Sequence, residues 1–442
     1  MAAELRTVKT AAELALAESY ASAKAKLPGG GKVIALRDAA FKRFEAQGLP
    51  HRRVEQWKYT DLRALLRDAK PLAGPPDAAA IERARTAGRL VDDMDLRRIV
   101  FVDGAFMPEL SDLKNLSPGL RIRPMAAALA DNDPLLAKYL GQVVPADEGV
   151  VALNTALMRD GALIHVAKGA TVENPLHLVF AATGDKPASI FTRSLVVIEQ
   201  NARAMLVETH EGMAEHQINT ALELVVGEGA HADHIKITTG GPMVHISSLM
   251  AAIGARARFN DFSYTTGGAV VRNQLFMRFD GEGTLANIRG ATLLKGAQHV
   301  DTTLVADHAA GGCQSREVFK AVLDDKSRSV FQGKIIVQPK SQKTDAKMMT
   351  NSLLLSDDAE ADQKPELEIF ADDVQCGHGA TSGALDENLK FYLMARGLPE
   401  VEAEALLVQA FVGDAVEGIE HAGLRDALME DVAAWLRARG GA

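Results

Sequence analysis

Cysteine is rare in this chain, since only Cys313 and Cys376 occur among 442 residues. An all-cysteine metal site needs about four thiolates, so this chain cannot build one alone. In a reducing compartment, two lone cysteines are more often separate buried thiols than a disulfide. We therefore expect Cys313 to be a core thiol.

Long apolar runs are also missing. No stretch approaches the roughly 18 apolar residues of a membrane span, and the first residues, MAAELRTVKTAAELALAES, lack a signal-peptide layout. The expected location is cytoplasmic, with no membrane partner. The formal net charge of −9 argues against non-specific nucleic-acid binding, which needs a basic surface.

Motifs for an independent active site are absent from the sequence. The Gly-rich stretch 28–33 (PGGGKV) invites a phosphate-loop interpretation, but Lys26 and Val33 occupy the positions of the required Gly and Ser/Thr. No Gly-x-Ser-x-Gly elbow, dinucleotide fingerprint or Cys-x-x-Cys pair occurs. The stretch 28–33 is interpreted as a helix stop, and the chain as a protein without its own catalytic site.

The first part of the chain is mainly helical. Residues 11–25 and 34–46 are rich in strong helix formers. Residues 98–102 (RIVFV) form a strand candidate that ends at a hairpin-type turn, Asp103-Gly104. These features predict an N-terminal helical and mixed domain over residues 1–150.

The pattern changes between residues 151 and 385, where short apolar runs alternate with Gly, Ala, Asn and Asp. The clearest units, each followed by a Gly or Asn corner, are 162–166 (ALIHV), 195–198 (LVVI), 222–226 (LELVV) and 249–253 (LMAAI). Turns recur every 25–32 residues or so, which is typical of a solenoid whose coils share one core. The sequence predicts a mainly β fold with a β-helix core over 151–385. A β-sandwich is the alternative, and the pattern leaves the handedness open.

Helical patterns return over residues 386–442. Asp386 is a candidate N-cap, Gly397 a helix stop, and Pro399 fits the first turn of the next helix. Leu424, Leu428 and Trp435 lie on one side of a final helix, together with Val432 and Leu436. The stripe fits packing onto the body and docking of a partner about equally well.

Cys376 and His378 are the most informative candidate site. They lie two residues apart after a segment (365–370, PELEIF) that alternates like a strand, with Leu367 and Ile369 expected inward. On an extended backbone the two share a face, about 6.6 Å apart. A thiolate and an imidazole can bind the same metal, but two ligands leave its coordination incomplete. For an isolated pair, a buried thiol and a structural histidine is the preferred alternative.

Other clusters are weaker candidates. His231-x-Asp233-His234 holds metal-compatible residues, but Asp233 and His234 should point to opposite faces of a strand. The pairs His299/Asp301 and Asp307/His308 have the same weakness.

Several long motifs resemble the SufB/SufD family of iron–sulfur cluster assembly proteins, in the family's order. The motifs are 331–335 (FQGKI), 342–346 (QKTDA), 351–356 (NSLLLS), 365–381 (PELEIFADDVQCGHGAT) and 391–397 (FYLMARG). Upstream, 53–62 (RVEQWKYTDL) resembles the motif typical of the SufD type. The length, this motif and the two cysteines favour SufD over SufB, whose chains are typically longer and richer in cysteine.

The resemblance implies a right-handed parallel β-helix between helical N- and C-terminal domains. It also implies a complex with a SufB-like paralogue and a SufC-type ABC ATPase, in which this chain is a non-catalytic scaffold. By motif position, His378 would be a ligand of a transient iron–sulfur cluster at the SufB interface, with Cys376 as its neighbour. Leu424, Leu428 and Trp435 become candidate contacts for SufC. No cofactor should be held stably by the isolated chain. Flavin binding and homodimerisation stay open.

Two alternatives remain from the sequence. One is a SufB-like subunit with a cluster of its own, and the other is a β-helical enzyme that acts on polysaccharides. The first predicts a stable cluster on the isolated chain, and the second predicts catalytic activity without partners.

Overall fold

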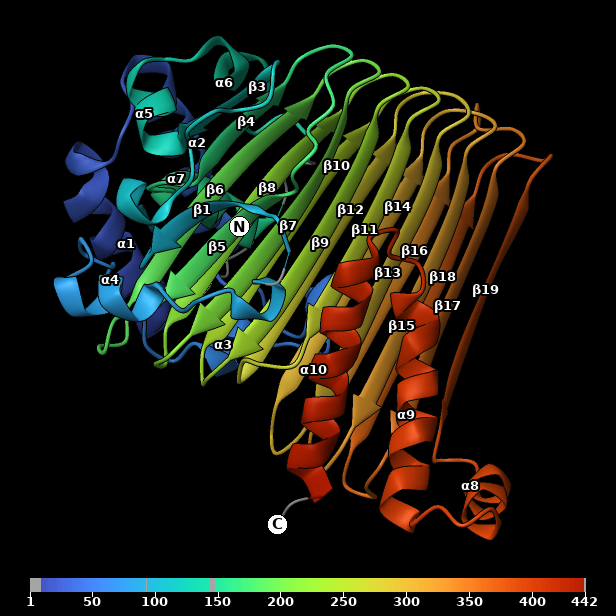
Figure 1. The fold of residues 1–442 in the computed structure, drawn as a ribbon. Helices are drawn as coiled ribbons and strands as arrows, with labels where there is room; N and C mark the ends of the chain where they lie inside the picture. The colour runs from blue at the N-terminus through green and yellow to red at the C-terminus, as the bar shows by residue number, and fades with distance from the viewer. Residues whose placement is uncertain (1–8, 93, 144–147, 441–442) are drawn as a thin grey trace, which may run out of the picture.

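The computed structural model describes residues 9–92, 94–143 and 148–440. Its body is a solenoid in which, from β4 on, successive strands alternate between two sheets and pair in parallel (Figure 1). Among the described strands, only the first ones pair antiparallel, β1 with β2 and β3 with β4. We name the two sheets odd and even after the numbers of most of their strands. The odd sheet contains β1 (Arg97–Val102), β2 (Ala105–Phe106), β5 (Leu176–Ala182), β7 (Arg203–Gly212), β9 (His231–Gly240), β11 (Arg258–Thr265), β13 (Leu285–Leu294), β15 (Gln314–Leu323), β17 (Asp345–Leu354) and β19 (Gln375–Gly383). The even sheet contains β3 (Leu120–Pro124), β4 (Ala162–Val166), β6 (Ser189–Ile198), β8 (Gln217–Val226), β10 (Val244–Ile253), β12 (Val270–Phe279), β14 (His299–His308), β16 (Arg328–Val337) and β18 (Glu360–Ile369). The predicted β-helix is confirmed, and the sandwich alternative is wrong.

Left-handed residues at the corners let the coils stack. Asn201 (φ 56°) and Gly229 (φ 63°) take this conformation as expected. At the next corner the left-handed residue is Arg256 (φ 54°) rather than a glycine or asparagine. A Cβ on Gly229 would lie 2.3 Å from the Asn201 side-chain oxygen, so a larger residue there would require the Asn201 side chain to move.

Alternation along each strand divides the side chains into an interior set and an outer set. In β8, Leu222 and Leu224 face the interior core, whereas Ala221 faces the N-terminal helices. The interior core draws on both sheets and extends from Ile99 to Ala371, with Cys376 packed against it. Cys313 is fully buried in this core, as expected, and its thiol donates to the carbonyl of Gly281 at 3.3 Å.

Helices cover the outer face of each sheet. The N-terminal helices are α1 (Ala11–Ala23), α2 (Gly31–Gln47), α3 (Leu62–Leu65), α4 (Ala78–Ala84), α5 (Met125–Ala130), α6 (Pro134–Tyr139) and α7 (Gly149–Leu157). Helices α1, α2 and α7 pack on the even sheet near its N-terminal end. The C-terminal helices are α8 (Glu387–Ala395), α9 (Glu400–Val416) and α10 (Ala422–Gly440), and the last two pack on the odd sheet (Figure 1). Among the described residues, none of the helices combines the length and the apolar character that a bilayer crossing needs.

The local predictions at both ends of the chain hold. Asp103 (φ 49°) and Gly104 (φ 81°) form the turn between β1 and β2. The Asp386 side chain accepts hydrogen bonds from the first turn of α8, as an N-cap should.

The expected domain boundary at residue 150 falls inside α7, and β1 of the N-terminal region pairs with β5 of the solenoid. Division into three domains stays a prediction.

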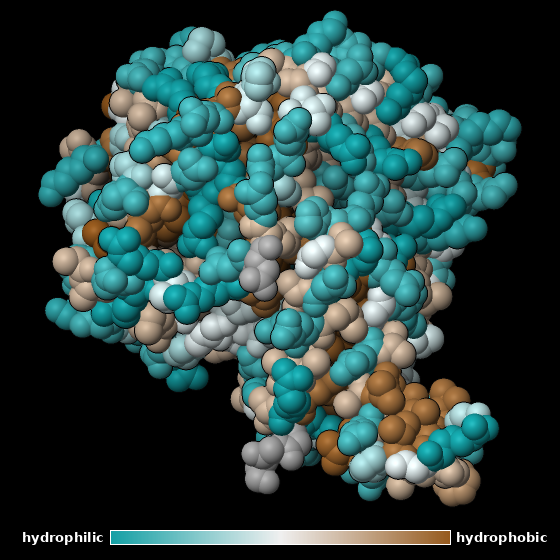
Figure 2. Space-filling model, in the orientation of Figure 1, coloured by the Kyte–Doolittle hydropathy of each residue, from teal (hydrophilic) through white to brown (hydrophobic). Residues whose placement is uncertain are grey.

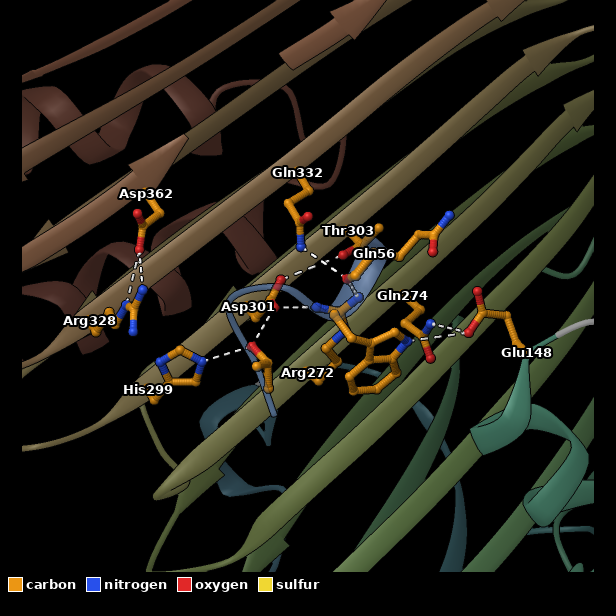
Figure 3. A network of polar contacts seen from close by, with 12 residues as sticks. Gln56, Glu148, Arg272, Gln274, His299, Asp301, Thr303, Arg328, Gln332 and Asp362 are labelled. Atoms are coloured by element: carbon orange, nitrogen blue, oxygen red, sulfur yellow. Dashed lines mark hydrogen bonds and ion pairs between the residues drawn. The ribbon is translucent and has the colours of Figure 1, made fainter. Parts of the chain in front are cut away.

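The motif at 53–62 binds the N-terminal region to the outer face of the even sheet. Trp57 is buried under the guanidinium of Arg272, which lies 4.1 Å from the ring centre. Arg272 also pairs with Asp301 and donates to the carbonyl of Gln56 at 2.6 Å (Figure 3). The Thr60 hydroxyl donates to Asp301. Asp301 is therefore part of a buried anchor, not of a metal site.

Candidate functional site

The solenoid ends in a coil that no described residue of this chain covers. This terminal coil consists of β18 and β19, which pair only with β16 and β17. Leu367 packs against the interior core as predicted, and Ile369 lies in register with the buried Val337. Ile369 is nevertheless 41% exposed, because the next coil that would cover it is absent. Interior-type positions are thus open to the surroundings at this end, which we name the open end.

Cys376 and His378 lie at the open end on the same face of β19. They are in register with Ala346 and Met348, whose side chains are buried in the interior core. The predicted shared face is therefore confirmed. Cys376 is half-buried and His378 is exposed. The Cys376 sulfur and the His378 imidazole therefore lie on the interior side of the terminal coil. Another molecule can still cover this coil.

The electrostatics keep the Cys376 sulfur protonated. Burial raises the pKa of the Cys376 thiol, and the negative charges of Asp345 and Glu317 raise it further. A metal ion is the kind of ligand that would displace this proton, since metals bind the thiolate. Gly377, between the two donors, has open space where a Cβ would lie, so a partner can approach the backbone closely.

The two edges of the terminal coil differ in their free backbone groups. Gln375 N–H donates to Thr344 on the β17 side, so residues 376, 378, 380 and 382 direct their N–H groups to the free side. On β18, Phe370 N–H donates to Val337, so residue 365 falls on the free side, and it is a proline. Proline is tolerated at such an edge position because no ladder bond is lost. The free edge of β19 therefore offers a complete row of donors, and that of β18 does not.

The weaker clusters have structural partners. His234 points inward and contacts Asp261 at 2.7 Å, whereas Asp233 points outward, as predicted for adjacent strand residues. His308 stacks on Phe279 and contacts Ser315 at 3.1 Å. Each of these two histidines thus makes one polar contact inside the fold through a ring nitrogen.

One outer cluster brings three metal-compatible side chains together. Ligand atoms of His231, Asp233 and Glu420 lie within 4.8 Å of one another. Glu420 already contacts Arg203 at 3.6 Å and Arg258 at 3.4 Å. Because these two cations balance the negative charges of Asp233 and Glu420, we interpret the cluster as a polar contact that holds the α9–α10 loop on the odd sheet.

The C-terminal stripe is occupied within the chain. Leu424 and Leu428 are fully buried and Trp435 is 7% exposed, in a cluster with Ile235, Phe262 and other outer residues of the odd sheet. These three side chains therefore take the packing role, which their pattern also allowed, and are not open to a partner. Amphipathic spacing shows that a helix buries one face, but it does not show against what.

The exposed apolar surface of the C-terminal region lies elsewhere, on α8 and the first half of α9. We name it the α8 surface, and it consists of Leu389 (52% exposed), Phe391 (72%), Tyr392 (54%), Met394 (39%), Val401 (63%) and Leu406 (45%). In Figure 2 apolar residues gather at the lower right, where Figure 1 places α8. Motif 391–397 carries half of this surface, but from the sequence it was interpreted as part of a helix and as a family motif, not as an exposed apolar surface.

Comparisons with known proteins match nearly the whole chain to one family. Residues 180–411 match the SUF system FeS cluster assembly SufBD core domain, and residues 16–178 match the SufBD protein N-terminal region. The chain is 31% identical over 398 residues to an iron–sulfur cluster assembly SufBD family protein of Synechocystis sp., covering 87% of each chain. It is 31% identical over 391 residues to the iron–sulfur cluster assembly protein SufD of Escherichia coli, covering 86% of this chain and 88% of the relative. SufD of Bacillus subtilis is 24% identical over 386 residues, covering 85% of this chain and 87% of that one.

The two family models thus cover the N-terminal region and most of the β-helix described above. The chain belongs to the SufB/SufD family of iron–sulfur cluster assembly proteins. Within that family it is SufD-like.

Proposed function

We propose that this chain is the SufD-type scaffold subunit of a cytoplasmic SufBCD complex that assembles iron–sulfur clusters with energy from ATP. The observation that carries the proposal is the open end, where Cys376 and His378 lie on the interior face of an uncovered coil. The cluster is the complex's product, and this chain contributes only part of its ligands. The chain itself performs no catalysis, since the ATPase is a separate subunit.

A SufB-like paralogue is the partner that fits the open end. A second β-helix of the same kind would present two edges at the same spacing and continue both sheets. The free β19 edge, with its row of N–H donors, would pair directly. Such pairing would bring the partner's thiolates next to His378 and complete a site that this chain leaves unfinished.

A SufC-type ATPase is the partner that fits the α8 surface. This surface groups aromatic and aliphatic side chains, and aromatic residues are enriched in the apolar centre of protein interfaces. It belongs to the same helical unit that packs on the odd sheet. Movement of a docked ATPase would therefore be transmitted to the solenoid and to its open end.

Replacement of Ala380 by proline tests the β19 edge. Ala380 directs its N–H to the free side, so Ala380→Pro removes a donor for the partner while leaving the β17 ladder intact. We expect affinity for the SufB-like partner to fall by about tenfold. Ala380→Ser, which keeps the N–H, is the matched control. Partner affinity that is the same for both variants and the wild type, measured by calorimetry, would show that β19 does not pair with the partner.

Truncation of Phe391 tests the α8 surface. The side chain is 72% exposed, so Phe391→Ala should leave the thermal midpoint unchanged. We expect it to weaken binding of the ATPase by about tenfold or more, as for an aromatic hot spot. Leu14→Ala, which removes a 52% exposed side chain from α1, serves as the control and should bind like the wild type. Undiminished binding by Phe391→Ala would place the ATPase on another surface.

A further inference from the structure

Glu317 is a carboxyl group buried without a partner inside the solenoid near its open end. Its side chain lies on β15 and is completely buried. Among the described residues, it is the one buried carboxylate for which neither oxygen has a hydrogen-bond partner. The nearby Ser315 hydroxyl is hydrogen-bonded to Nε2 of His308, at 3.1 Å.

The register places Glu317 directly below the proposed cluster ligand. Glu317 is in register with Met348 on β17, and Met348 is in register with His378 on β19. Two strand spacings separate the Cα atoms of Glu317 and His378, which is about 10 Å. Cys376 lies in the neighbouring interior column, since it is in register with Ala346 on β17, and Ala346 is in register with Ser315 on β15, two residues from Glu317.

Packing does not explain a carboxylate at this position. The neighbours in the same column are Ile288 and Met348, both apolar, and both are buried in the interior core. Other buried carboxylates have partners: Glu223 pairs with Arg193, Asp301 pairs with Arg272, and Asp160 accepts hydrogen bonds from backbone N–H groups. An uncompensated buried carboxyl group is costly, so its retention points to a ligand that the isolated chain lacks.

The available donors suit a divalent metal ion of the iron class. Glu317 offers oxygen, His378 offers nitrogen and Cys376 offers sulfur, a mixed set that borderline metals accept. Met348 lies between the first two, and its unbranched side chain has the rotational freedom to move aside. It carries a thioether sulfur as a further soft donor.

We propose that Glu317 is a third protein ligand, with Cys376 and His378, for a divalent metal ion at the open end. This inference rests on the proposed function, because it extends the same site inward. It assigns the isolated chain a site for a single ion that precedes cluster assembly, rather than a site for a finished cluster.

Cobalt(II) binding to the full-length chain tests this inference. Co²⁺ is a spectroscopic probe for such sites, and thiolate ligation gives an intense near-ultraviolet absorption. We expect Glu317→Gln to weaken Co²⁺ binding by about tenfold and to alter the visible ligand-field bands. Glu366→Gln is the matched control, because it removes a carboxylate from the outer face of the terminal coil. It should bind Co²⁺ like the wild type.

The variants distinguish an error in the ligand role of Glu317 from an error in the open-end site itself. If Glu317→Gln binds like the wild type while Cys376→Ser and His378→Ala lose binding, Glu317 is not a ligand but the open-end site stands. If none of the three variants changes Co²⁺ binding, both this inference and the ligand role of the open end are wrong. If Glu366→Gln weakens binding as much as Glu317→Gln, the effect is one of overall charge and Glu317 is not a ligand.

Discussion

The Glu317→Gln variant should be more stable than the wild type at pH 8, by about 3 kcal/mol in the free energy of unfolding. Burial raises the pKa of Glu317 to about 7, from an ordinary value of 4.5. The Ser315 hydroxyl lies close enough to moderate this shift, although the two make no hydrogen bond of good geometry. A shift of this size corresponds to about 3 kcal/mol of destabilisation once the carboxyl group is ionised.

The direction in which stability changes with pH depends on which state, folded or unfolded, binds the Glu317 proton more tightly. Between pH 4.5 and 7 the folded chain holds the Glu317 proton more tightly than the unfolded chain does. This contribution to stability is therefore fully present below pH 4.5 and is lost as the pH rises to 7. The neutral amide does not titrate, so the advantage of Glu317→Gln should be about 1 kcal/mol at pH 5 and about 3 kcal/mol at pH 8.

Urea denaturation of both proteins at the two pH values measures this difference. Glu366→Gln removes a carboxylate that is partly exposed, so its effect should be small and nearly independent of pH. A difference between wild type and Glu317→Gln that does not change from pH 5 to pH 8 would mean that Glu317 has an ordinary pKa. In that event the Glu317 carboxylate would have a partner within the fold, and its burial would not indicate a metal ligand.

The solenoid could be predicted because its signals are local and repeat. Corners such as Asn201 and Gly229 need a left-handed backbone, and the runs between them match the strand period. Less regular corners were missed, since Arg256 and Lys343 also have positive φ, and neither residue type favours that conformation. Stacking of one corner on the next overrides the local preference of a single residue.

The face shared by Cys376 and His378 was predictable from the two-residue period, but the uncovered end of the solenoid was not. Whether the last coil is covered depends on where distant segments of the chain pack, and a local sequence pattern does not show this. The same limit explains Leu424 and Trp435, whose stripe is filled by the odd sheet. Glu317 carried a signal, because it shares strand parity with Phe319 and Ala321, both of which are buried in the structure.

The second large effect concerns His378. His378→Ala should leave the complex with the SufB-like and SufC-type subunits intact, because the imidazole is exposed and does not belong to the core of the described residues. Cluster formation should fall by about tenfold to a hundredfold, since loss of a ligand costs at least as much as loss of a supporting group. Cys376→Ser should have a smaller effect, since a SufB-like partner would supply most of the thiolates.

The most direct measurement is the amount of cluster formed per intact complex, with wild type and His378→Ala assembled in parallel under anaerobic conditions. His165→Ala, which alters a histidine at the opposite end of the solenoid, controls for the loss of an imidazole. We predict that the wild type and His165→Ala form equal amounts of cluster and that His378→Ala forms at most about a tenth as much. Equal yields for all three proteins, with the complex intact, would mean that His378 is not a cluster ligand and that the open end is not the assembly site.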